Sequence, residues 1–222
     1  MVRVPYCRDR KPGEGFQEEG ENLEFTLVYE GPLYAHRETR LRAAHKHSIR
    51  KQFHPQLRKL WSTKLSHWVS GNQTSALKRV WSAGGPLVEQ IANHFQVCDY
   101  RFVPLVTERL MLACKFDILF LRREIGKGKI IQGGDIDNRL KSLFDAMKIP
   151  KKCEDIGGEK PSEDENPFYS LLEDDSLITD IKVRADTLLT PAESVDDEHI
   201  AKLIIGVTLR PLQLTEFNSD FA

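Results

Sequence analysis

The chain has 222 residues, of which 40% are hydrophobic and 29% are charged, and its formal net charge is −1 at pH 7. These proportions are typical of a globular chain with enough apolar residues for one core, and the length accommodates a single domain with insertions. No apolar run is as long as a membrane span, and the first residues contain no apolar segment of the kind found in secretion signals. We therefore expect a cytoplasmic protein that does not associate with membranes.

The four cysteines of the chain are scattered and include no C-x-x-C pair, the spacing that structural zinc sites commonly show. They are Cys7, Cys98, Cys114 and Cys153. We expect them to be ordinary reduced thiols rather than a disulfide framework.

The near-zero net charge conceals a strong asymmetry along the chain. Residues 34–81 contain eleven Lys and Arg against one acid, whereas residues 153–180 contain ten Asp and Glu against one lysine. Such a division favours one surface that meets a polyanion and another that holds cations. The alternative is that two solvated faces partly neutralise each other. Candidate phosphate contacts in the basic stretch are Arg37, Arg40, Arg42, Lys46, Arg50, Lys51, Arg58 and Lys59.

The N-terminal part of the chain predicts a tail followed by a strand. Residues 1–22 have almost no apolar periodicity, so we expect a flexible tail. Residues 23–30 alternate apolar and polar side chains and end at Gly31-Pro32, a pattern that predicts a strand followed by a turn.

The basic stretch predicts two helical pieces. The first runs from Glu38 to about Phe53 and is interrupted by Pro55, because proline lacks the backbone N–H that a helix interior uses. The second covers residues 56–69, with apolar side chains at spacings of three to four. Within these pieces we expect Trp61 and Trp68 in the core, and His45 and His47 at the surface because no metal-ligand frame surrounds them.

The middle of the chain predicts a helix, a buried strand and a second helix. Residues 86–95 have a helical pattern, and the long apolar run 110–121 is typical of a buried central strand. A helix over residues 138–147 is stopped by Pro150. The acidic stretch 151–170 is long for a loop in a compact domain, so we expect a functional or mobile insertion.

The C-terminal part predicts two strands, over residues 178–188 and 200–209, which we expect to form a β-hairpin with a long loop at 190–199. The resulting order is strand, helices, strand, helix, strand, strand, which indicates a single mixed α/β domain with a small mixed sheet. We place this domain at residues 23–213, with insertions at about 55–106 and 151–170, and a C-terminal tail at 214–222.

The segment Asp135-Ile136-Asp137-Asn138 carries the clearest chemical signal. In an extended segment both carboxylates would share one face, and Asp137 stands where a helix N-cap belongs. Along the helix, Asp137, Lys141 and Asp145 are spaced by four and predict a polar stripe. The opposite apolar stripe must face the core. It contains Ile136, Leu140, Leu143, Phe144 and Met147.

Carboxylates that lie close together repel each other unless a cation offsets their charge. Mg²⁺ is the expected ion, because it prefers oxygen ligands and binds through one or two carboxylates plus substrate phosphate. A second acidic patch, Glu173-Asp174-Asp175, precedes the strand near residue 178 and could complete a three-carboxylate site. D-x-D alone is weakly specific, and a plain N-cap with a solvated neighbour is the alternative. The calcium-loop pattern is absent.

The run D-I-D-N-R-L-K-S-L-F-D-A-M, followed by L-E-D-D before a strand, resembles the RusA family of Holliday-junction resolvases. The resemblance implies that Asp135 and Asp137 are paired metal ligands and that Asp175, or its neighbour Asp174, is the last acid. Lys141 would be catalytic, with Asn138 and Asp145 in supporting positions. It further implies a homodimer that cuts four-way DNA junctions in recombination and repair with Mg²⁺, for which Mn²⁺ can substitute.

The sequence departs from the compact family pattern in its long loop at 151–170 and its extra helical material at 55–106. Two other functions therefore stay open. One is a branched-DNA-binding protein of the same fold without turnover. The other is a metal-dependent hydrolase of small phosphate esters, for which the basic stretch would have no use.

Overall fold

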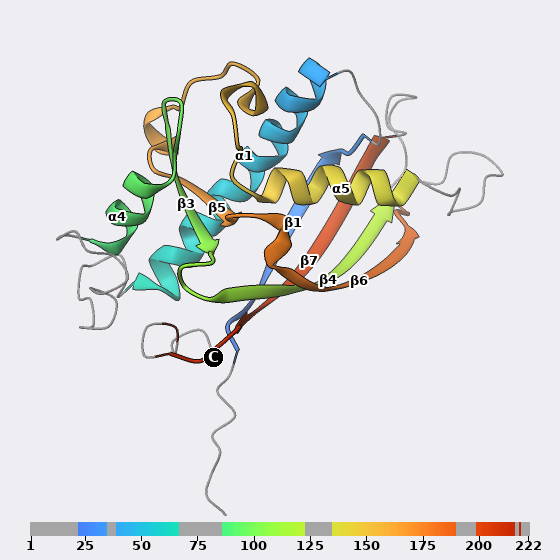
Figure 1. Cartoon of the computed structure of the whole chain (residues 1–222). Coiled ribbons are helices and arrows are strands. Elements are labelled where there is room, and N and C mark those ends of the chain that lie inside the picture. The colour runs from blue at the N-terminus through green and yellow to red at the C-terminus, as the bar shows by residue number, and fades with distance from the viewer. Residues whose placement is uncertain are drawn as a thin grey trace, which may run out of the picture.

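The computed structural model describes residues 22–34, 39–66, 86–122, 135–189, 199–215 and 218, without the side chains of Thr39, Arg40 and Asp135. Residues 1–21 of the predicted N-terminal tail (1–22), Trp68 and most of the loop 190–199 lie outside these residues. The helices and strands are shown in Figure 1. In chain order they are β1 (Glu24–Pro32), α1 (Thr39–Thr63), α4 (Leu87–His94), β2 (Gln96–Val97), β3 (Tyr100–Val106), β4 (Leu112–Arg122), α5 (Asp135–Met147), β5 (Phe168–Leu172), β6 (Ile178–Thr187) and β7 (Ile200–Pro211), with short 3₁₀ helices η1 (Cys153–Ile156), η2 (Glu163–Glu165) and η3 (Asp175–Leu177).

The described residues form one mixed α/β domain whose main sheet has the strand order β1-β7-β4-β6. Strand β7 is antiparallel to β1 and to β4, whereas β4 and β6 are parallel. The predicted central position of the apolar run in β4 is confirmed. The predicted hairpin is wrong, because β6 and β7 lie on opposite sides of β4. The most apolar strand thereby gains a partner on each side, which leaves the more polar β6 at the edge.

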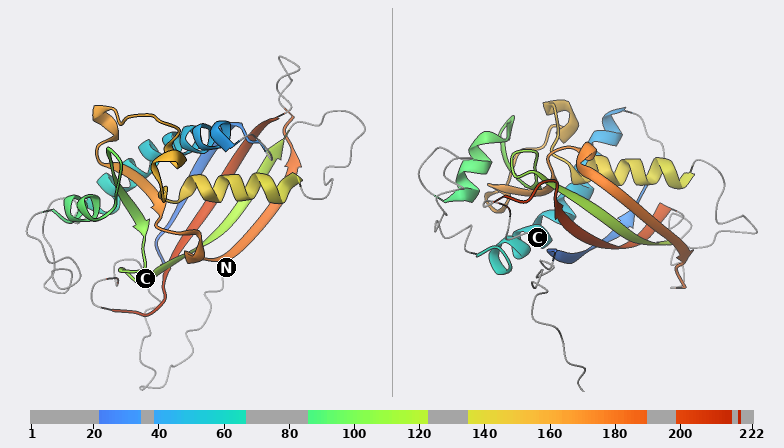
Figure 2. Two further views of the ribbon diagram at one scale, coloured as in Figure 1. Left: turned by 45° about the horizontal axis from the view of Figure 1, so that its top comes forward. Right: turned by 60° about the horizontal axis from the view of Figure 1, so that its bottom comes forward.

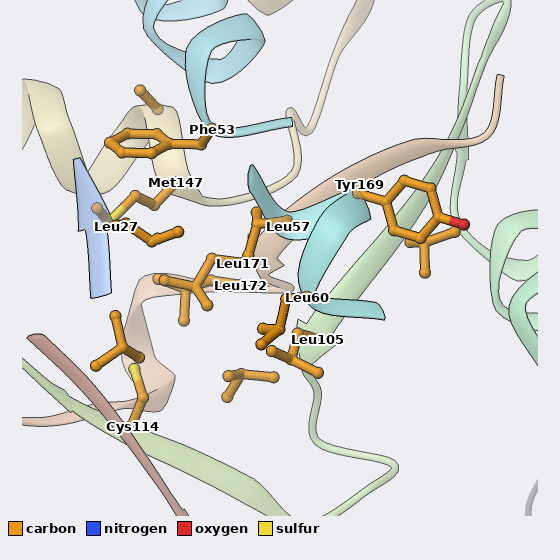
Figure 3. Close-up of a cluster of buried hydrophobic side chains, with 14 of the residues drawn as sticks. Leu27, Phe53, Leu57, Leu60, Leu105, Cys114, Met147, Tyr169, Leu171 and Leu172 are labelled. Carbon is orange, nitrogen blue, oxygen red and sulfur yellow. The ribbon is translucent and has the colours of Figure 1, made fainter. Parts of the chain in front are cut away.

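One face of the main sheet is apolar and is covered by helices. Leu27, Ile205, Ile118 and Val183 occupy neighbouring positions across the four strands, and the first three are almost fully buried. Helices α1 and α5 run across this face (Figure 2). Side chains from β1, α1, α5 and β5 meet between the helices and the strands, as Figure 3 shows. The core therefore lies between the sheet and its two covering helices.

Helix α1 is continuous from Thr39 to Thr63 and contains Pro55 in its interior, so the predicted break is wrong. Proline in a helix interior costs about 3 kcal/mol. Here Pro55 is exposed, while Phe53 and Leu57 on either side are buried. Burying one such apolar side chain contributes about 1.5–3 kcal/mol, so the continuous apolar stripe outweighs the lost hydrogen bond.

Two further predictions for α1 have different outcomes. Trp61 is fully buried, which confirms its predicted place in the core. His45 and His47 are also buried, at 8% and 0% exposure, so their predicted surface position is wrong. His47 lies 3.1 Å from the hydroxyl of Tyr100 and accepts a hydrogen bond from Arg50 at its Nδ1, so its polar atoms have partners inside the protein.

A second sheet, with the strand order β2-β3-β5, was not predicted. Strands β3 and β5 pair in parallel, and Phe102 and Phe168 face each other in register and are fully buried. Strand β3 falls in the stretch 55–106 that we interpreted as an insertion, and β5 begins in the other one, 151–170, and extends two residues beyond it. Pro104 argues against a strand within β3, and β5 has only five residues at the end of the acidic stretch.

The acidic stretch 151–170 packs against the basic helix α1. Lys51 forms ion pairs with Glu159 and, at 3.3 Å, with Glu165. Arg58 lies 3.4 Å from the carboxylate of Asp164. The two charged regions of the chain therefore neutralise each other in part, as the alternative interpretation of the charge asymmetry predicts.

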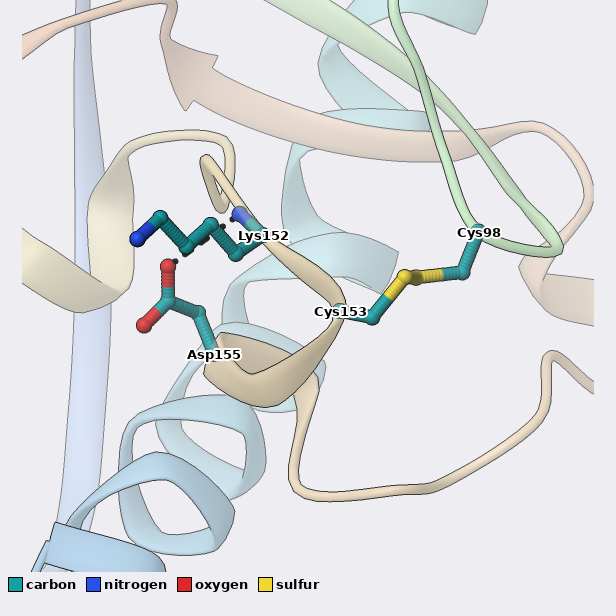
Figure 4. The surroundings of a disulfide bond; sticks show 4 residues. All are labelled: Cys98, Lys152, Cys153 and Asp155. Carbon is teal, nitrogen blue, oxygen red and sulfur yellow. Dashed lines mark hydrogen bonds between the residues drawn. A yellow bond between two sulfur atoms is a disulfide. The ribbon is translucent and has the colours of Figure 1, made fainter.

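A disulfide joins Cys98, in the turn between β2 and β3, to Cys153 at the start of η1, with a Cα–Cα distance of 5.7 Å (Figure 4). The prediction of reduced thiols is therefore wrong for this pair, which the fold brings together across 55 residues of sequence. Cys114 is a buried free thiol, and Cys7 lies outside the described residues. Among the helices that the structure describes, none is long and apolar enough to span a membrane.

Candidate active site

Helix α5 begins at Asp135, so Asp137 is its third residue rather than its N-cap. The condition for both carboxylates to share one face, an extended segment, is not met: the segment is helical, and residues two apart in a helix are about 200° apart around its axis. The side chain of Asp135 is not among those described. The predicted helix itself is confirmed, and it starts three residues earlier than expected.

Three of the predicted site residues line one pocket between α5 and β6. Its volume is about 290 Å³. The lining side chains are Asp137, Leu140, Lys141, Phe144, Asp175 and Ile181. Asp137 and Lys141 come from α5, and Asp175 from η3, which directly precedes β6. We call this the acidic pocket. The fold thus brings together carboxylates that the long acidic stretch separates in sequence.

The position of the acidic pocket follows from the way α5 packs on the sheet. Phe144 of α5 stacks on Phe116 of β4, with ring centroids 5.7 Å apart, and this contact fixes the helix over the strand. Ile181 of β6 lies beside Phe116 in register, so it faces the same helix. Because β6 is the last strand on this side of the described sheet, Ile181 keeps 45% exposure and the pocket opens at the sheet edge.

Asp174 and Asp175 have different surroundings. Both oxygens of Asp174 have partners: Oδ1 accepts the backbone N–H of Ser176 at 3.1 Å, and Oδ2 lies 2.8 Å from Nζ of Lys151. The lysine and the backbone N–H hold the pKa of Asp174 well below its usual value. Asp175 lines the acidic pocket and has 44% side-chain exposure. Of the two aspartates, Asp175 is therefore the one available to a ligand in the pocket.

Asp145 does not line the acidic pocket, so the predicted stripe ends at Lys141. Each step of four residues turns about 40° around the helix, and Asp145 is two steps beyond Asp137. Its carboxylate forms ion pairs with Lys46 of α1 and, at 3.1 Å, with Lys148. Burial alone would raise the pKa of Asp145, but the hydrogen bonds from the two lysines bring it below its ordinary value. Asp145 thus connects α5 to α1.

Lys148 is a site residue that the sequence did not indicate. Its Nζ lies 3.0 Å from Asp175 and 3.1 Å from Asp145, and the side chain has 17% exposure. Burial lowers the pKa of Lys148, but hydrogen bonds to the two carboxylates outweigh this and raise it overall. The spacing of three from Asp145 would have predicted the first contact. The contact with Asp175 depends on the tertiary fold.

Asn138 and the predicted phosphate contacts of the basic stretch differ in burial and in their contacts. Asn138 is half-buried, and its carbonyl accepts a hydrogen bond from Ser142. Arg50 is 2% exposed and donates to two backbone carbonyls, so its guanidinium lies inside the protein and not on an exposed face. Lys46 and Lys51 form ion pairs within the chain. Arg42 is exposed, whereas Arg37 and the side chain of Arg40 are outside the described part.

The carboxylates of the acidic pocket suit a hard divalent cation. Within the described side chains, no group of three His, Cys, Asp or Glu is arranged to hold a metal ion. The pocket offers the carboxylates of Asp137 and Asp175. This donor set fits Mg²⁺, which commonly binds through one or two carboxylates and completes its shell with water and substrate phosphate.

Comparisons with known proteins identify no relative of the chain: no family model, no curated protein and no solved structure matches it.

Proposed function

We propose that this protein is a Mg²⁺-dependent endonuclease selective for branched DNA such as four-way junctions. The observation that supports the proposal most is the convergence of Asp137, Lys141 and Asp175 on one open pocket. These residues come from two segments that the RusA resemblance pairs with each other. The acidic stretch between them, which could have separated the two halves, packs on α1 instead and leaves both halves at the same pocket.

Each pocket residue has a role in this proposal. Asp137 and Asp175 would hold the cation, whose chemistry is to activate water and to stabilise charge on the phosphate. Lys141 would donate hydrogen bonds to an oxygen of the scissile phosphate and stabilise the charge that develops there. Leu140, Phe144 and Ile181 give the pocket apolar walls beside these charged groups.

Two incisions are needed to resolve a four-way junction, so the proposal includes a homodimer in which two-fold symmetry supplies two pockets. It also places the protein in the cytoplasm with its DNA substrate.

The test is cleavage of a labelled four-way junction in Mg²⁺ and in Mn²⁺. We expect cleavage by the wild type and by Asp117→Asn, and none by Asp137→Asn. Asp117 is a matched control because its carboxylate is exposed and pairs with Lys182 instead of lining the pocket. An intact junction with wild-type protein, or cleavage by Asp137→Asn at the wild-type rate, contradicts the proposal. Junction binding without cleavage would identify a binding protein without turnover.

A second candidate function is hydrolysis of small phosphate esters at the same pocket. It is favoured by the ion pairs of Lys46 and Lys51, which leave less of the basic stretch for a long polyanion. The salt dependence of substrate binding separates the two functions. A DNA substrate that releases many counterions binds with a steep salt dependence, whereas a small ester has a shallow one.

A further inference from the structure

A second pocket lies between α1 and the segment that follows α5. Its volume is about 170 Å³. The lining residues are Lys46, Arg50, Asp145, Lys148, Ile149, Pro150, Lys151 and Asp155. We call this the basic pocket, because four cationic side chains line it against two carboxylates.

Arg50 is the cation of the basic pocket that groups of the protein hold in place, so its charge is preorganised. Arg50 donates to the carbonyls of Lys148 and Asp145 at 3.2 and 3.3 Å and to Nδ1 of His47 at 3.1 Å. These bonds use three of the five N–H groups of a guanidinium. Burial lowers the pKa of Arg50 to about 10, so it stays charged at neutral pH. A buried cation with unused donors favours an anion nearby.

The basic pocket adjoins the acidic pocket through two lysines. Nζ of Lys148 is within 3.1 Å of both Asp145, which lines the basic pocket, and Asp175, which lines the acidic one. Lys151 lines the basic pocket and pairs with Asp174, the neighbour of Asp175. A chain of phosphates with one group at the acidic pocket would therefore pass the basic pocket within the reach of one lysine side chain.

We propose that the basic pocket is an oxyanion subsite that takes a phosphate group of the strand, next to the phosphate held at the acidic pocket. Lys46, Lys148 and Lys151 donate to its oxygens, and Arg50 supplies a fixed positive charge. A phosphate can accept from several donors at once, so it can replace the carboxylates that these lysines now contact. The assignment to a strand rests on the proposed function. Binding of an oxyanion at the basic pocket does not depend on that function.

Titration of the protein with inorganic phosphate, without a divalent metal, tests the subsite by NMR. We expect the backbone amide signals of Ile149 and Lys151 to shift in a saturable manner, and the shifts to be lost in Lys151→Met. The matched control is Lys182→Met, which removes a lysine of similar side-chain exposure (67%, against 69% for Lys151) that also pairs with an aspartate. Absence of shifts in the wild type, or undiminished shifts in Lys151→Met, overturns the subsite.

Binding of a short single-stranded oligonucleotide, in Ca²⁺ to prevent turnover, tests the source of the phosphate. If the strand supplies it, Lys151→Met binds more weakly and its slope of log affinity against log salt is smaller by about 1, whereas Lys182→Met keeps the wild-type slope. An unchanged slope in Lys151→Met overturns the strand assignment. Lys46→Met is the second variant, for which we expect the same smaller slope, and a dispersed NMR spectrum is the check that it is folded.

These measurements separate the subsite from the proposed function. Phosphate binding requires neither cleavage nor a metal, so a protein that cuts no junction can still show the subsite. Conversely, cleavage of the junction without any response of the Ile149 and Lys151 signals to phosphate would support the nuclease function and contradict the subsite.

Discussion

Asp174 and Asp175 are adjacent in sequence, but their carboxylates have different tasks in the structure. Asp174 caps η3 and pairs with Lys151, and Asp175 lines the acidic pocket. We expect Asp175→Asn to lower kcat by about 100-fold or more, because metal-supported charge stabilisation contributes several kcal/mol and about 1.4 kcal/mol is tenfold in rate.

Asp174→Asn keeps a capping side chain and loses an ion pair with an exposed lysine, so it should retain activity and cost about 1 kcal/mol or less in stability. Junction cleavage and urea unfolding of the two isosteric variants check the assignment. Comparable loss of activity in both would show that Asp174 also serves the pocket.

His47 gives the fold a pH-dependent stability. Burial, followed by the charge of Arg50, lowers its pKa from 6.5 to about 4. The folded protein therefore keeps His47 neutral where the unfolded chain binds a proton. Its stabilising contribution is complete above pH 6.5 and is lost as the pH falls towards 4.

The lowered pKa corresponds to about 3 kcal/mol over that range. The pKa of buried His54 is also lowered, chiefly by desolvation, and acts in the same direction. Urea unfolding between pH 7 and 4.5 should give a shallower pH slope for His47→Gln than for the wild type. The control is His94→Gln, which changes an exposed histidine and should keep the wild-type slope. An equally steep slope in His47→Gln would show that His47 does not cause the pH dependence of stability.

At the scale of elements, Gln56 of α1 protects the edge of the main sheet. Its side-chain amide accepts from the N–H of Val28 at 2.9 Å and donates to the carbonyl of Val28 at 2.7 Å and to that of Gln52 at 3.0 Å. It thus pairs with edge strand β1 as a neighbouring strand would, and covers groups that would otherwise template another chain.

Gln56→Ala should cost about 1–2 kcal/mol in unfolding free energy, because each net hydrogen bond contributes about 0.5–1.5 kcal/mol and the site is partly solvated. The amide of Val28 should also exchange its hydrogen faster. Gln52→Ala, an exposed substitution on the same helix, is the control and should stay within about 0.5 kcal/mol of the wild type. Equal stability of the two variants would show that the hydrogen bonds between Gln56 and Val28 do not stabilise the fold.

The elements that could be predicted are those with a strong local pattern. The periodicity of α5 and the apolar run of β4 needed no knowledge of the rest of the chain. The places of β6 and β7 in the sheet could not be predicted in this way, because the two strands of a hairpin and two strands on either side of β4 have the same local pattern. Pro55 misled for a related reason, because burial of Phe53 and Leu57 beside it outweighs the local cost of proline, and that burial is a tertiary property.

The candidate site, like the fold, could be predicted from the sequence only in part. The residue types of Asp137, Lys141 and Asp175 indicated a common site, and the fold places them in one pocket. Lys148 was missed because its contact with Asp175 joins the residue that follows α5 to η3, which is distant in sequence. The disulfide was missed because compatible positions of Cys98 and Cys153 exist only once β2, β3 and η1 are folded.

At the scale of the whole molecule, the disulfide ties the acidic stretch to the turn between β2 and β3, and the ion pairs of Lys51 hold it against the basic helix α1. A disulfide of this kind typically contributes about 2–4 kcal/mol by restricting the unfolded chain. We expect dithiothreitol to lower the unfolding free energy of the wild type by that amount. The double variant Cys98→Ser/Cys153→Ser should be equally destabilised and insensitive to the reductant.

Denaturant unfolding with and without dithiothreitol measures both effects, and peptide mapping without reduction identifies the linked cysteines. No response of the wild type to dithiothreitol would show that the pair is not joined in solution. Both redox forms need testing for activity, because the proposed function places the protein in the cytoplasm, a compartment that keeps most thiols reduced.

The parallel pairing of β4 and β6 has a consequence for how this chain can vary. A parallel pair of strands needs a crossover connection. In this protein the crossover from β4 to β6 supplies both halves of the acidic pocket, because α5 lies near its beginning and η3 at its end. Its two ends are fixed by the sheet, so the number of residues between them can change without moving the pocket. Lengthening a loop is inexpensive, at about 0.6 kcal/mol for each doubling. Sequence separation and site geometry are therefore independent in this fold, and the crossover is where the protein can acquire new segments while its pocket stays the same.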